Sequence, residues 1–232
     1  MSETDIADGS SPAPQPGRPR PLRGVITDWG GVMTNPIIET VTAWLDHDGI
    51  DRDSYRTVMR AWVAVAYQGG DAVSPIRALE TGQCTEAEFE RQLAGQLVRV
   101  DGGAVLADGL LTRMFAAAQY DQMMHDLIRA ARQAGLRTGL LSNSWGGSYP
   151  RHLFPELFDG VVISGEVGMR KPEERIFRLA AKVIGLEPAE CVFIDDIEEN
   201  IRAGEAVGML GVHHRSTAQT RARVGELLGI PV

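Results

Sequence analysis

Short apolar runs alternate with amphipathic stretches along the second half of the chain, and this pattern restricts the fold more than any other feature. Strand-like runs fall at residues 24–27, 137–141, 160–163, 191–194 and 210–213. Apolar residues recur at helical spacing over 123–134, 173–184 and 199–207. Strands and helices that alternate with short connections predict an α/β fold, in which helices cover both faces of a parallel sheet.

The first two strand-like runs are separated by far more residues than a crossover loop needs. Within this insert, apolar residues recur at helical spacing over 40–47, 55–67 and 106–118. A capping box at 85–88 opens a further helix that continues to Val98. The sequence therefore predicts a core made of residues 22–34 and 120–232, with residues 35–119 inserted as a small helical cap over the strand tips.

Composition places the chain among soluble globular proteins. Hydrophobic residues make up 44% and charged residues 23% of the 232 residues. The net charge of -8 argues against a nucleic-acid surface, which is usually basic, and no apolar run is long enough for a membrane span. Residues 1–21 are rich in Ser, Pro and Gly, so we expect a disordered tail there. The N-terminus lacks a signal-peptide pattern, and the expected location is cytoplasmic.

Polar residues follow three of the strand-like runs at the point where each run ends. Asp28 comes directly after the first run, Ser142 and Asn143 after the second, and Asp195 and Asp196 close the fourth. The carboxyl ends of parallel strands meet at one edge of an open sheet, where such sheets place their functional groups. We therefore expect these side chains to form one site.

The carboxylates suit two different tasks. Asp28, followed by two glycines, can attack phosphorus and form an aspartyl-phosphate, although an isolated Asp-x-Gly is more often a turn cap. Asp195 and Asp196 suit Mg²⁺, which proteins bind through a few carboxylates together with substrate phosphate oxygens. An Asp-Asp pair can also serve only as a helix N-cap. Two adjacent acids at the mouth of an apolar strand favour the metal, because a cation offsets their repulsion.

Lys171 and the residues after the second strand-like run can bind phosphate. Lys171, which precedes Pro172 at the start of a helical stretch, can neutralise phosphate charge. Ser142 and Asn143 can donate hydrogen bonds to phosphate oxygens. Each group alone has an ordinary alternative, a solvent-exposed lysine or a polar turn. Their occurrence together and in this order favours a single phosphoryl-transfer site.

Together these motifs resemble the haloacid dehalogenase superfamily of Asp-nucleophile hydrolases, over about residues 23 to 215. Further segments resemble the branch that contains the phosphatase domain of epoxide hydrolases. These segments are residues 79–82, 85–89, 165–168, 195–196, 200 and 208–209. The resemblance implies a Rossmann-like, three-layer parallel-sheet core, an α-helical cap inserted after the first motif, and a Mg²⁺ cofactor.

The resemblance also assigns a role to each residue of the expected site. Asp28 would be the nucleophile and a metal ligand, and Ser142 and Lys171 would bind phosphate. Asp196 would be the principal acidic metal ligand of the last motif, with Asp195 as its neighbour. Lys171 would also be a catalytic residue, together with Asp28.

One residue departs from the pattern of the superfamily. Active phosphatases of this kind usually carry an aspartate two residues after the nucleophile, where it protonates the leaving oxygen and later activates water. Here that residue is Gly30. The backbone carbonyl, which also binds the metal in the superfamily, is retained at Gly30. Metal binding should therefore survive, while acid–base help worth about 10²- to 10⁴-fold is lost from this position.

The expected function is that of a Mg²⁺-dependent phosphatase that acts on a small phosphorylated metabolite, with another group replacing the missing acid. One alternative is a weakly active or inactive relative that binds a phosphorylated ligand or a partner protein. A more distant alternative is a metal-independent dehalogenase, which would gain nothing from Asp195 and Asp196. No nucleic-acid or membrane partner is expected, and no motif between Asn35 and Tyr120 specifies a substrate or an oligomeric state.

Overall fold

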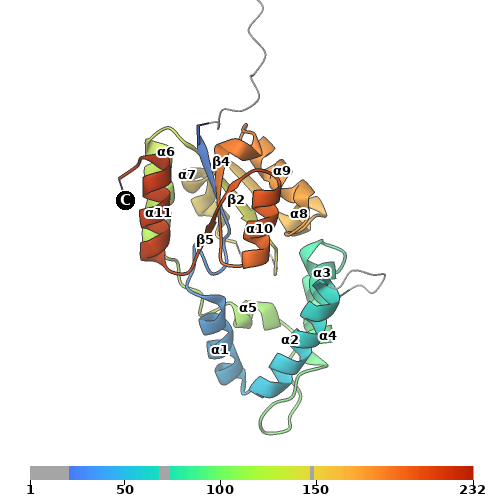
Figure 1. Cartoon of the computed structure of the whole chain (residues 1–232). Coiled ribbons are helices and arrows are strands. Elements are labelled where there is room, and N and C mark those ends of the chain that lie inside the picture. The colour runs from blue at the N-terminus through green and yellow to red at the C-terminus, as the bar shows by residue number, and fades with distance from the viewer. Residues whose placement is uncertain (1–20, 68–73, 147–148, 232) are drawn as a thin grey trace, which may run out of the picture.

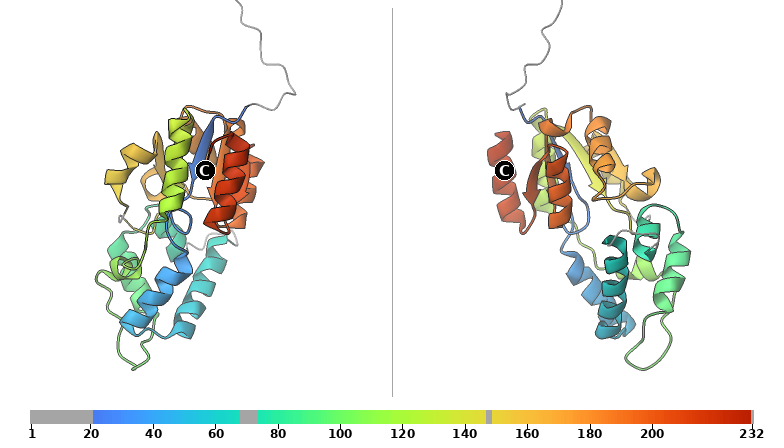
Figure 2. Two further views of the ribbon diagram at one scale, coloured as in Figure 1. Left: turned by 90° about the vertical axis from the view of Figure 1, so that its left-hand side faces the viewer. Right: turned by 45° about the vertical axis from the view of Figure 1, so that its right-hand side comes forward.

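The computed structural model describes residues 21–67, 74–146 and 149–231. The tail predicted for residues 1–21 therefore lies almost entirely outside the described part of the chain. Figures 1 and 2 show two groups of elements, a sheet flanked by helices and a separate set of helices beside one end of that sheet.

A five-stranded parallel sheet forms the centre of the larger group, in the strand order β3-β2-β1-β4-β5. Its strands are β1 (Gly24–Thr27), β2 (Arg137–Ser142), β3 (Gly160–Ile163), β4 (Cys191–Asp195) and β5 (Leu210–His213). All five predicted strands are present, within one residue at each end. The predicted α/β fold with a parallel sheet is therefore confirmed.

The register of the sheet brings the predicted site residues to one level. Thr27 of β1 pairs with Leu140 of β2 on one side and with Ile194 of β4 on the other. The chain leaves β1 at the next residue, Asp28, beside the end of β4 at Asp195. The two carboxylates are therefore set side by side by strand pairing alone.

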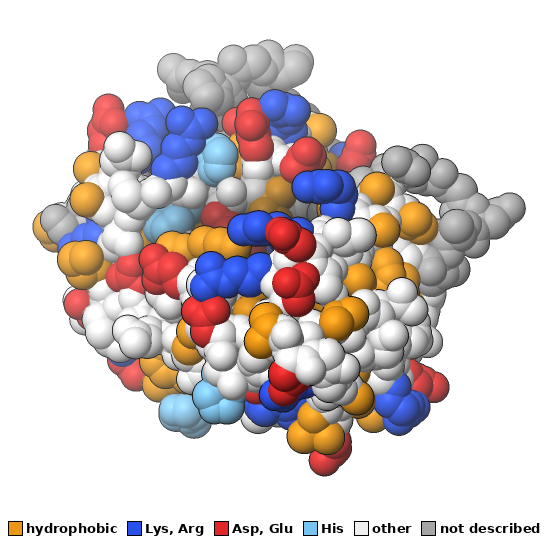
Figure 3. Space-filling view, turned by 90° about the horizontal axis from the view of Figure 1, so that it is seen from below, with side chains coloured by type: hydrophobic (Ala, Val, Ile, Leu, Met, Phe, Trp, Pro, Cys, Tyr) orange, Lys and Arg blue, Asp and Glu red, His pale blue; other side chains and the backbone are white. Residues whose placement is uncertain are grey.

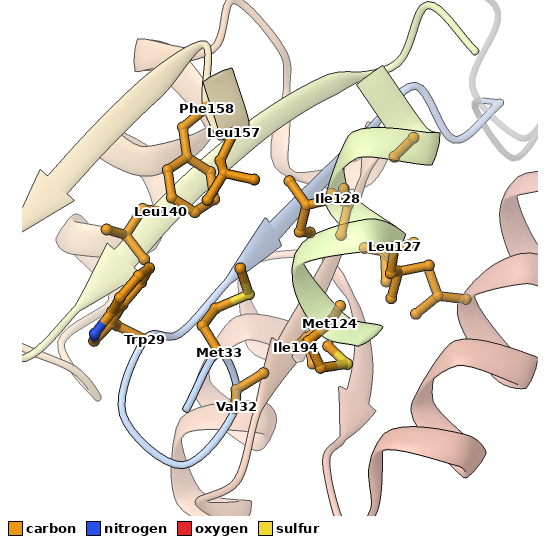
Figure 4. Close-up of a cluster of buried hydrophobic side chains, with 14 of the residues drawn as sticks. Trp29, Val32, Met33, Met124, Leu127, Ile128, Leu140, Leu157, Phe158 and Ile194 are labelled. Atoms are coloured by element: carbon orange, nitrogen blue, oxygen red, sulfur yellow. The ribbon is translucent and has the colours of Figure 1, made fainter. Parts of the chain in front are cut away.

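Helices cover both faces of the sheet (Figure 1). One face is covered by α6 (Gln122–Gln133) and α11 (Thr217–Leu228), and the other by α9 (Glu174–Val183) and α10 (Glu198–Ala206). Successive side chains of a strand point to opposite faces, so alternate strand residues belong to the hydrophobic clusters on the two faces of the sheet. Figure 4 shows the α6 side, where Met124, Leu127 and Ile128 pack towards the sheet. Short turns complete this group: α7 (Phe154–Leu157), α8 (Ser164–Val167), and 3₁₀ turns at Arg151–Leu153 and Pro188–Glu190.

The smaller group contains the helices inserted between β1 and α6. They are α1 (Ile37–Asp48), α2 (Arg52–Tyr67), α3 (Pro75–Glu80), α4 (Glu86–Ala94) and α5 (Leu110–Met114). These helices share a hydrophobic cluster of their own, which includes the buried side chains of Trp44, Phe89 and Leu110. We propose that this group, hereafter the cap, is the predicted cap domain.

Two predicted cap helices are wrong in extent. The helix expected to reach Val98 ends at Ala94, where Gly95 follows. The helix expected over 106–118 is reduced to α5, because Gly109 precedes it in a left-handed conformation and the apolar residues around it pack as irregular turns. The capping box itself is confirmed, with Thr85 and Glu88 each bonding the backbone of the other.

Four helices, α3, α7, α8 and α11, were not expected from the sequence.

In the described ranges, no helix combines the length and apolar character needed to cross a membrane. Acidic and basic side chains are interspersed on the face seen in Figure 3. The predicted absence of a nucleic-acid partner stays a prediction.

Candidate active site

Three carboxylates meet at the carboxyl edge of the sheet. Asp28, Asp195 and Asp196 each offer one oxygen, and these oxygens all lie within 4.8 Å of one another. The first follows β1, and the other two close β4 and begin the turn into α10. Like charges at this separation repel one another strongly at a buried site, so the cluster requires cations.

Lys171 supplies one of those cations from the loop before α9. Its side chain is fully buried, with Nζ 2.9 Å from Asp28 Oδ1 and 2.6 Å from Asp195 Oδ2. Burial alone would lower the pKa of Lys171, but the charges of Asp195 and Asp28 outweigh it and raise the pKa above its usual value. The ammonium group is therefore held charged between the two strand ends.

Asp28 is held in a defined orientation at the strand tip. Its Oδ1 accepts hydrogen bonds from the backbone N–H of Trp29, at 2.7 Å, and from Lys171. Burial raises the pKa of Asp28 to about 7, and the nearby charge of Lys171 opposes this rise. The carboxylate thus lies in a water-poor pocket, where a second cation would favour its charged form.

Asp195 and Asp196 differ in what surrounds them. Asp195 is fully buried, and its Oδ1 accepts hydrogen bonds from the backbone N–H of Ile197 at 2.8 Å and from Asn200 Nδ2 at 3.0 Å. Asp196 is only partly buried, and burial together with the charge of Asp195 raises its pKa. Asp195 therefore fixes Lys171 and the start of α10, while Asp196 is more available to a metal.

Gly31 allows the β1 loop to approach Asp196 closely. Its φ of +75° lies in the left-handed region, and a Cβ placed there would stand 2.5 Å from Asp196 Oδ2. A residue with a side chain would thus be strained and would also displace the carboxylate.

We expect Gly31→Ala to lower both the stability of the protein and its affinity for Mg²⁺. The left-handed backbone alone costs about 1–2 kcal/mol for alanine, and relief of the Asp196 contact adds to that cost. The matched control is Gly102→Ala, because Gly102 has the same φ of +75° with nothing within 4 Å of its Cβ position. Urea unfolding of both variants checks the difference, and an equal loss of stability would contradict the argument.

Ser142 and Asn143 lie at the same edge but make different contacts. The Ser142 hydroxyl accepts a hydrogen bond from the Tyr149 hydroxyl at 2.9 Å. Asn143 exchanges two hydrogen bonds with the backbone of Lys171, receiving one from its N–H at 2.8 Å and donating one to its carbonyl at 3.1 Å. Asn143 thus holds the lysine loop in place, and its predicted contact with phosphate stays a prediction.

Gly30 lies where the cap meets the site. A Cβ at Gly30 would stand 3.1 Å from Ile37 Cδ1, the flexible end of a side chain at the start of α1. Trp29 beside it is buried and lines the cavity, with its ring edge-on to Tyr120 and Phe154. Trp29 therefore packs against neighbouring rings and forms part of the cavity wall.

Several site residues were missed by sequence reasoning. Arg170 and Glu80 form a buried ion pair, with Nε 2.6 Å from Oε2, and Trp145 Nε1 donates to Glu80 Oε1 at 3.0 Å. The pair joins α3 of the cap to the loop that carries Lys171. Tyr149 was missed as well. The contact between Glu80 and Arg170 could not be expected from a local pattern, because the two residues are distant in the sequence.

The donor set fits a hard divalent cation. Three carboxylates face one lysine, so with all groups ionised two negative charges remain without a partner in the cluster. Carboxylate oxygens are the ligands that Mg²⁺ takes in proteins, usually with water and substrate oxygens completing its shell. Asp28 and Asp196 would hold it, with Asp195 behind them and the Gly30 carbonyl as a further predicted ligand.

Comparison with known proteins agrees with this geometry. Residues 22–208 match the haloacid dehalogenase-like (HAD-like) hydrolases. The chain belongs to this family, and the resemblance drawn from the motifs is confirmed.

Two of the relatives of this chain are phosphatases. A sesquiterpene phosphatase of Aspergillus oryzae is 26% identical over 90% of this chain and 97% of its own length. A phosphatase of Mycobacterium tuberculosis is 26% identical over 63% of this chain and 64% of its own. The acyl-CoA dehydrogenase family member 10 of Mus musculus is 28% identical over 92% of this chain, which spans only 20% of that longer protein.

Solved structures share the fold. A HAD-family enzyme of Bacteroides thetaiotaomicron, crystallised as a mutant with magnesium and inorganic phosphate, has a TM-score of 0.60 at 20% identity. The match covers 84% of this chain and 94% of that chain. A dehalogenase has a TM-score of 0.61 at 15% identity, over 89% of this chain and 97% of that chain. At these identities the likeness concerns the fold alone, including its Rossmann-like sheet.

Proposed function

We propose that the protein is a Mg²⁺-dependent phosphomonoesterase that forms an aspartyl-phosphate on Asp28. The observation that carries the proposal is the bridging of Asp28 and Asp195 by the buried ammonium group of Lys171, next to Asp196. The proposed nucleophile, a buried cation and the proposed metal-binding carboxylate thus belong to one cluster, which supports the proposal. The phosphatase relatives support the same reaction class.

In the first step, a carboxylate oxygen of Asp28 attacks the phosphorus atom of a phosphate monoester. A bond forms between this oxygen and phosphorus, and the bond from phosphorus to the leaving oxygen breaks. Both contacts described for the carboxylate of Asp28 involve Oδ1, so Oδ2 is the oxygen proposed to attack. Lys171 and the Ser142 hydroxyl would bind the phosphoryl oxygens, and bound Mg²⁺ would supply neutralisation of phosphoryl charge.

In the second step, a water molecule attacks phosphorus and breaks its bond to Asp28, which returns the free carboxylate and releases inorganic phosphate. Gly30 has no side chain to give a proton to the leaving oxygen in the first step or to take one from water in the second. Solvent must then exchange these protons, unless another group does so. Leaving groups that are stable as anions, such as phenolates, should therefore be favoured over alkoxides.

The Gly30→Asp variant tests this reasoning. We expect it to raise kcat/KM for an alkyl phosphate by up to about 10²- to 10⁴-fold and for an aryl phosphate by much less. The Cβ of the new side chain needs only a small shift of the Ile37 side chain. Gly30→Asn is the matched control, because it adds similar volume without an acid. Equal gains on both esters, or an equal gain with asparagine, would contradict the missing-acid argument.

Removal of the metal tests the proposed function as a whole. Phosphate release from p-nitrophenyl phosphate is measured after treatment with EDTA and after return of Mg²⁺. This ester has a good leaving group, so it places little demand on an acid at Gly30. We expect turnover to be lost with EDTA and restored by Mg²⁺. Turnover that is unaffected by EDTA would refute the metal dependence.

Gly30 favours one second candidate, a protein of this family that binds a phosphorylated ligand with little or no turnover. A folded protein that binds phosphate with Mg²⁺ but releases none from the aryl ester, and forms no phosphoenzyme, would support this candidate. A metal-independent dehalogenase remains the more distant alternative, and halide release from a haloacid that persists in EDTA would separate it from both.

A further inference from the structure

A large cavity opens between the carboxyl edge of the sheet and the cap. Its volume is about 850 Å³, and Asp28, Lys171 and Ser142 lie in its wall. Ligand pockets in proteins typically measure about 300–1,000 Å³, so this one lies near the upper end of the range. A phosphoryl group bound at Asp28 would occupy only a small part of the cavity. The rest is available to the organic group of the substrate.

The cap contributes an almost entirely apolar wall to this cavity. Its lining side chains include Ile37, Val41, Met59, Ile76, Met114 and Phe115. They come from α1, α2, α3 and α5 and from the residue after α5, so no single helix accounts for the apolar surface. Among the described lining residues between 37 and 118, only Glu80 carries a charge.

The charge of Glu80 is already balanced. Arg170 lies 2.6 Å from Glu80 Oε2, and both side chains are less than 8% exposed. Trp145 donates to the other carboxylate oxygen. Because a buried pair of this kind compensates itself, it gives a charged group on the substrate no partner.

This lining discriminates between classes of phosphate ester. A sugar phosphate or an amino-acid phosphate would bring hydroxyl, ammonium or carboxylate groups into the cap side of the cavity. Such groups lose their water there and find few partners, which is costly for binding. A hydrocarbon group gains from leaving water, and each buried methylene contributes about fourfold in affinity.

We infer that the substrate is a phosphate monoester of a bulky apolar alcohol. Its phosphoryl group would lie at Asp28 and Lys171, with its hydrocarbon part inside the cap. For the phosphoryl end of the substrate, the inference rests on the proposed function. For its organic end, the inference rests on the apolar lining of the cavity.

Alkylphosphonates test the inference without turnover, because their P–C bond is not hydrolysed by this chemistry. Dissociation constants for the series from two to ten carbons are measured by titration calorimetry with Mg²⁺ present, below micelle-forming concentrations. We expect affinity to rise by about fourfold per methylene until the cavity is filled. The heat-capacity change of binding should become more negative along the series.

The Met59→Gln variant tests whether the gain in affinity with chain length arises at the cap wall of the cavity. It replaces a half-buried apolar side chain of the cavity wall with a polar one of similar length. We expect it to reduce the affinity for octylphosphonate by about tenfold and that for ethylphosphonate by much less. The control is Met123→Gln. Met123 is a 54% exposed methionine on α6 outside the cavity lining, so this variant should bind the whole series like the wild type.

Affinity that does not change with chain length would overturn the inference, as would failure of every phosphonate to bind or equal losses in the two methionine variants. Turnover of p-nitrophenyl phosphate is measured on the same preparations. A flat series in a protein with metal-dependent turnover refutes the apolar substrate alone. A steep series without turnover supports the apolar site and refutes the phosphatase.

Discussion

Replacing Asp28 with asparagine should abolish phosphatase turnover while leaving the fold intact. The change removes the attacking oxygen charge but keeps the size of the side chain, and loss of a nucleophile that acts with its neighbours as one unit costs roughly 10⁴-fold or more. Steady-state kinetics on p-nitrophenyl phosphate with Mg²⁺ measure the loss.

The matched control for this result is Asp108→Asn, an exposed aspartate of the cap whose side chain lies outside the site. It carries the same chemical change and should retain wild-type turnover. Thermal unfolding of both variants confirms that the proteins are folded. Robust turnover in a folded Asp28→Asn protein would refute the assignment of the nucleophile.

Replacing Lys171 with methionine should produce the largest loss of stability. The lysine is 1% exposed and pairs with both Asp28 and Asp195, so its removal leaves two buried carboxylates without their cation. Breaking one partner of a buried ion pair costs about 3–5 kcal/mol, and here two pairs depend on one lysine. Urea unfolding at neutral pH without metal measures the loss in the free energy of unfolding.

The chain offers a close control, because its only other lysine, Lys182, is exposed on α9. Lys182→Met should change the free energy of unfolding by less than about 0.5 kcal/mol. Saturating Mg²⁺ should restore part of the stability lost in Lys171→Met, because a second cation then balances the carboxylates. Equal effects of the two lysine variants would show that the buried bridge contributes nothing.

The strands and the meeting of the carboxylates could be predicted from the sequence. The strands are rich in apolar residues because a parallel sheet is buried on both faces, and each ends at or next to a polar residue. Once the strands are parallel, their carboxyl ends share an edge, so Asp28 and Asp195 had to lie close together.

The contacts between the cap and the core could not be predicted in the same way. Glu80 and Arg170 are far apart in the sequence, and neither belongs to a periodic pattern that would single it out. Likewise, apolar residues around α5 have helical spacing but pack as turns, because tertiary packing can satisfy them without a helix. The size and apolar character of the cavity emerge only when four cap helices are assembled over the sheet.

The most direct test of the central claim is to trap the covalent intermediate. The protein is mixed with p-nitrophenyl phosphate and Mg²⁺, quenched during the first turnovers and reduced with borohydride, which converts an aspartyl-phosphate to homoserine. Peptide mass spectrometry then locates the modified residue. We predict homoserine at position 28 and no modification in the absence of substrate. Turnover with an unmodified Asp28, or trapping at another carboxylate, would contradict the proposed mechanism.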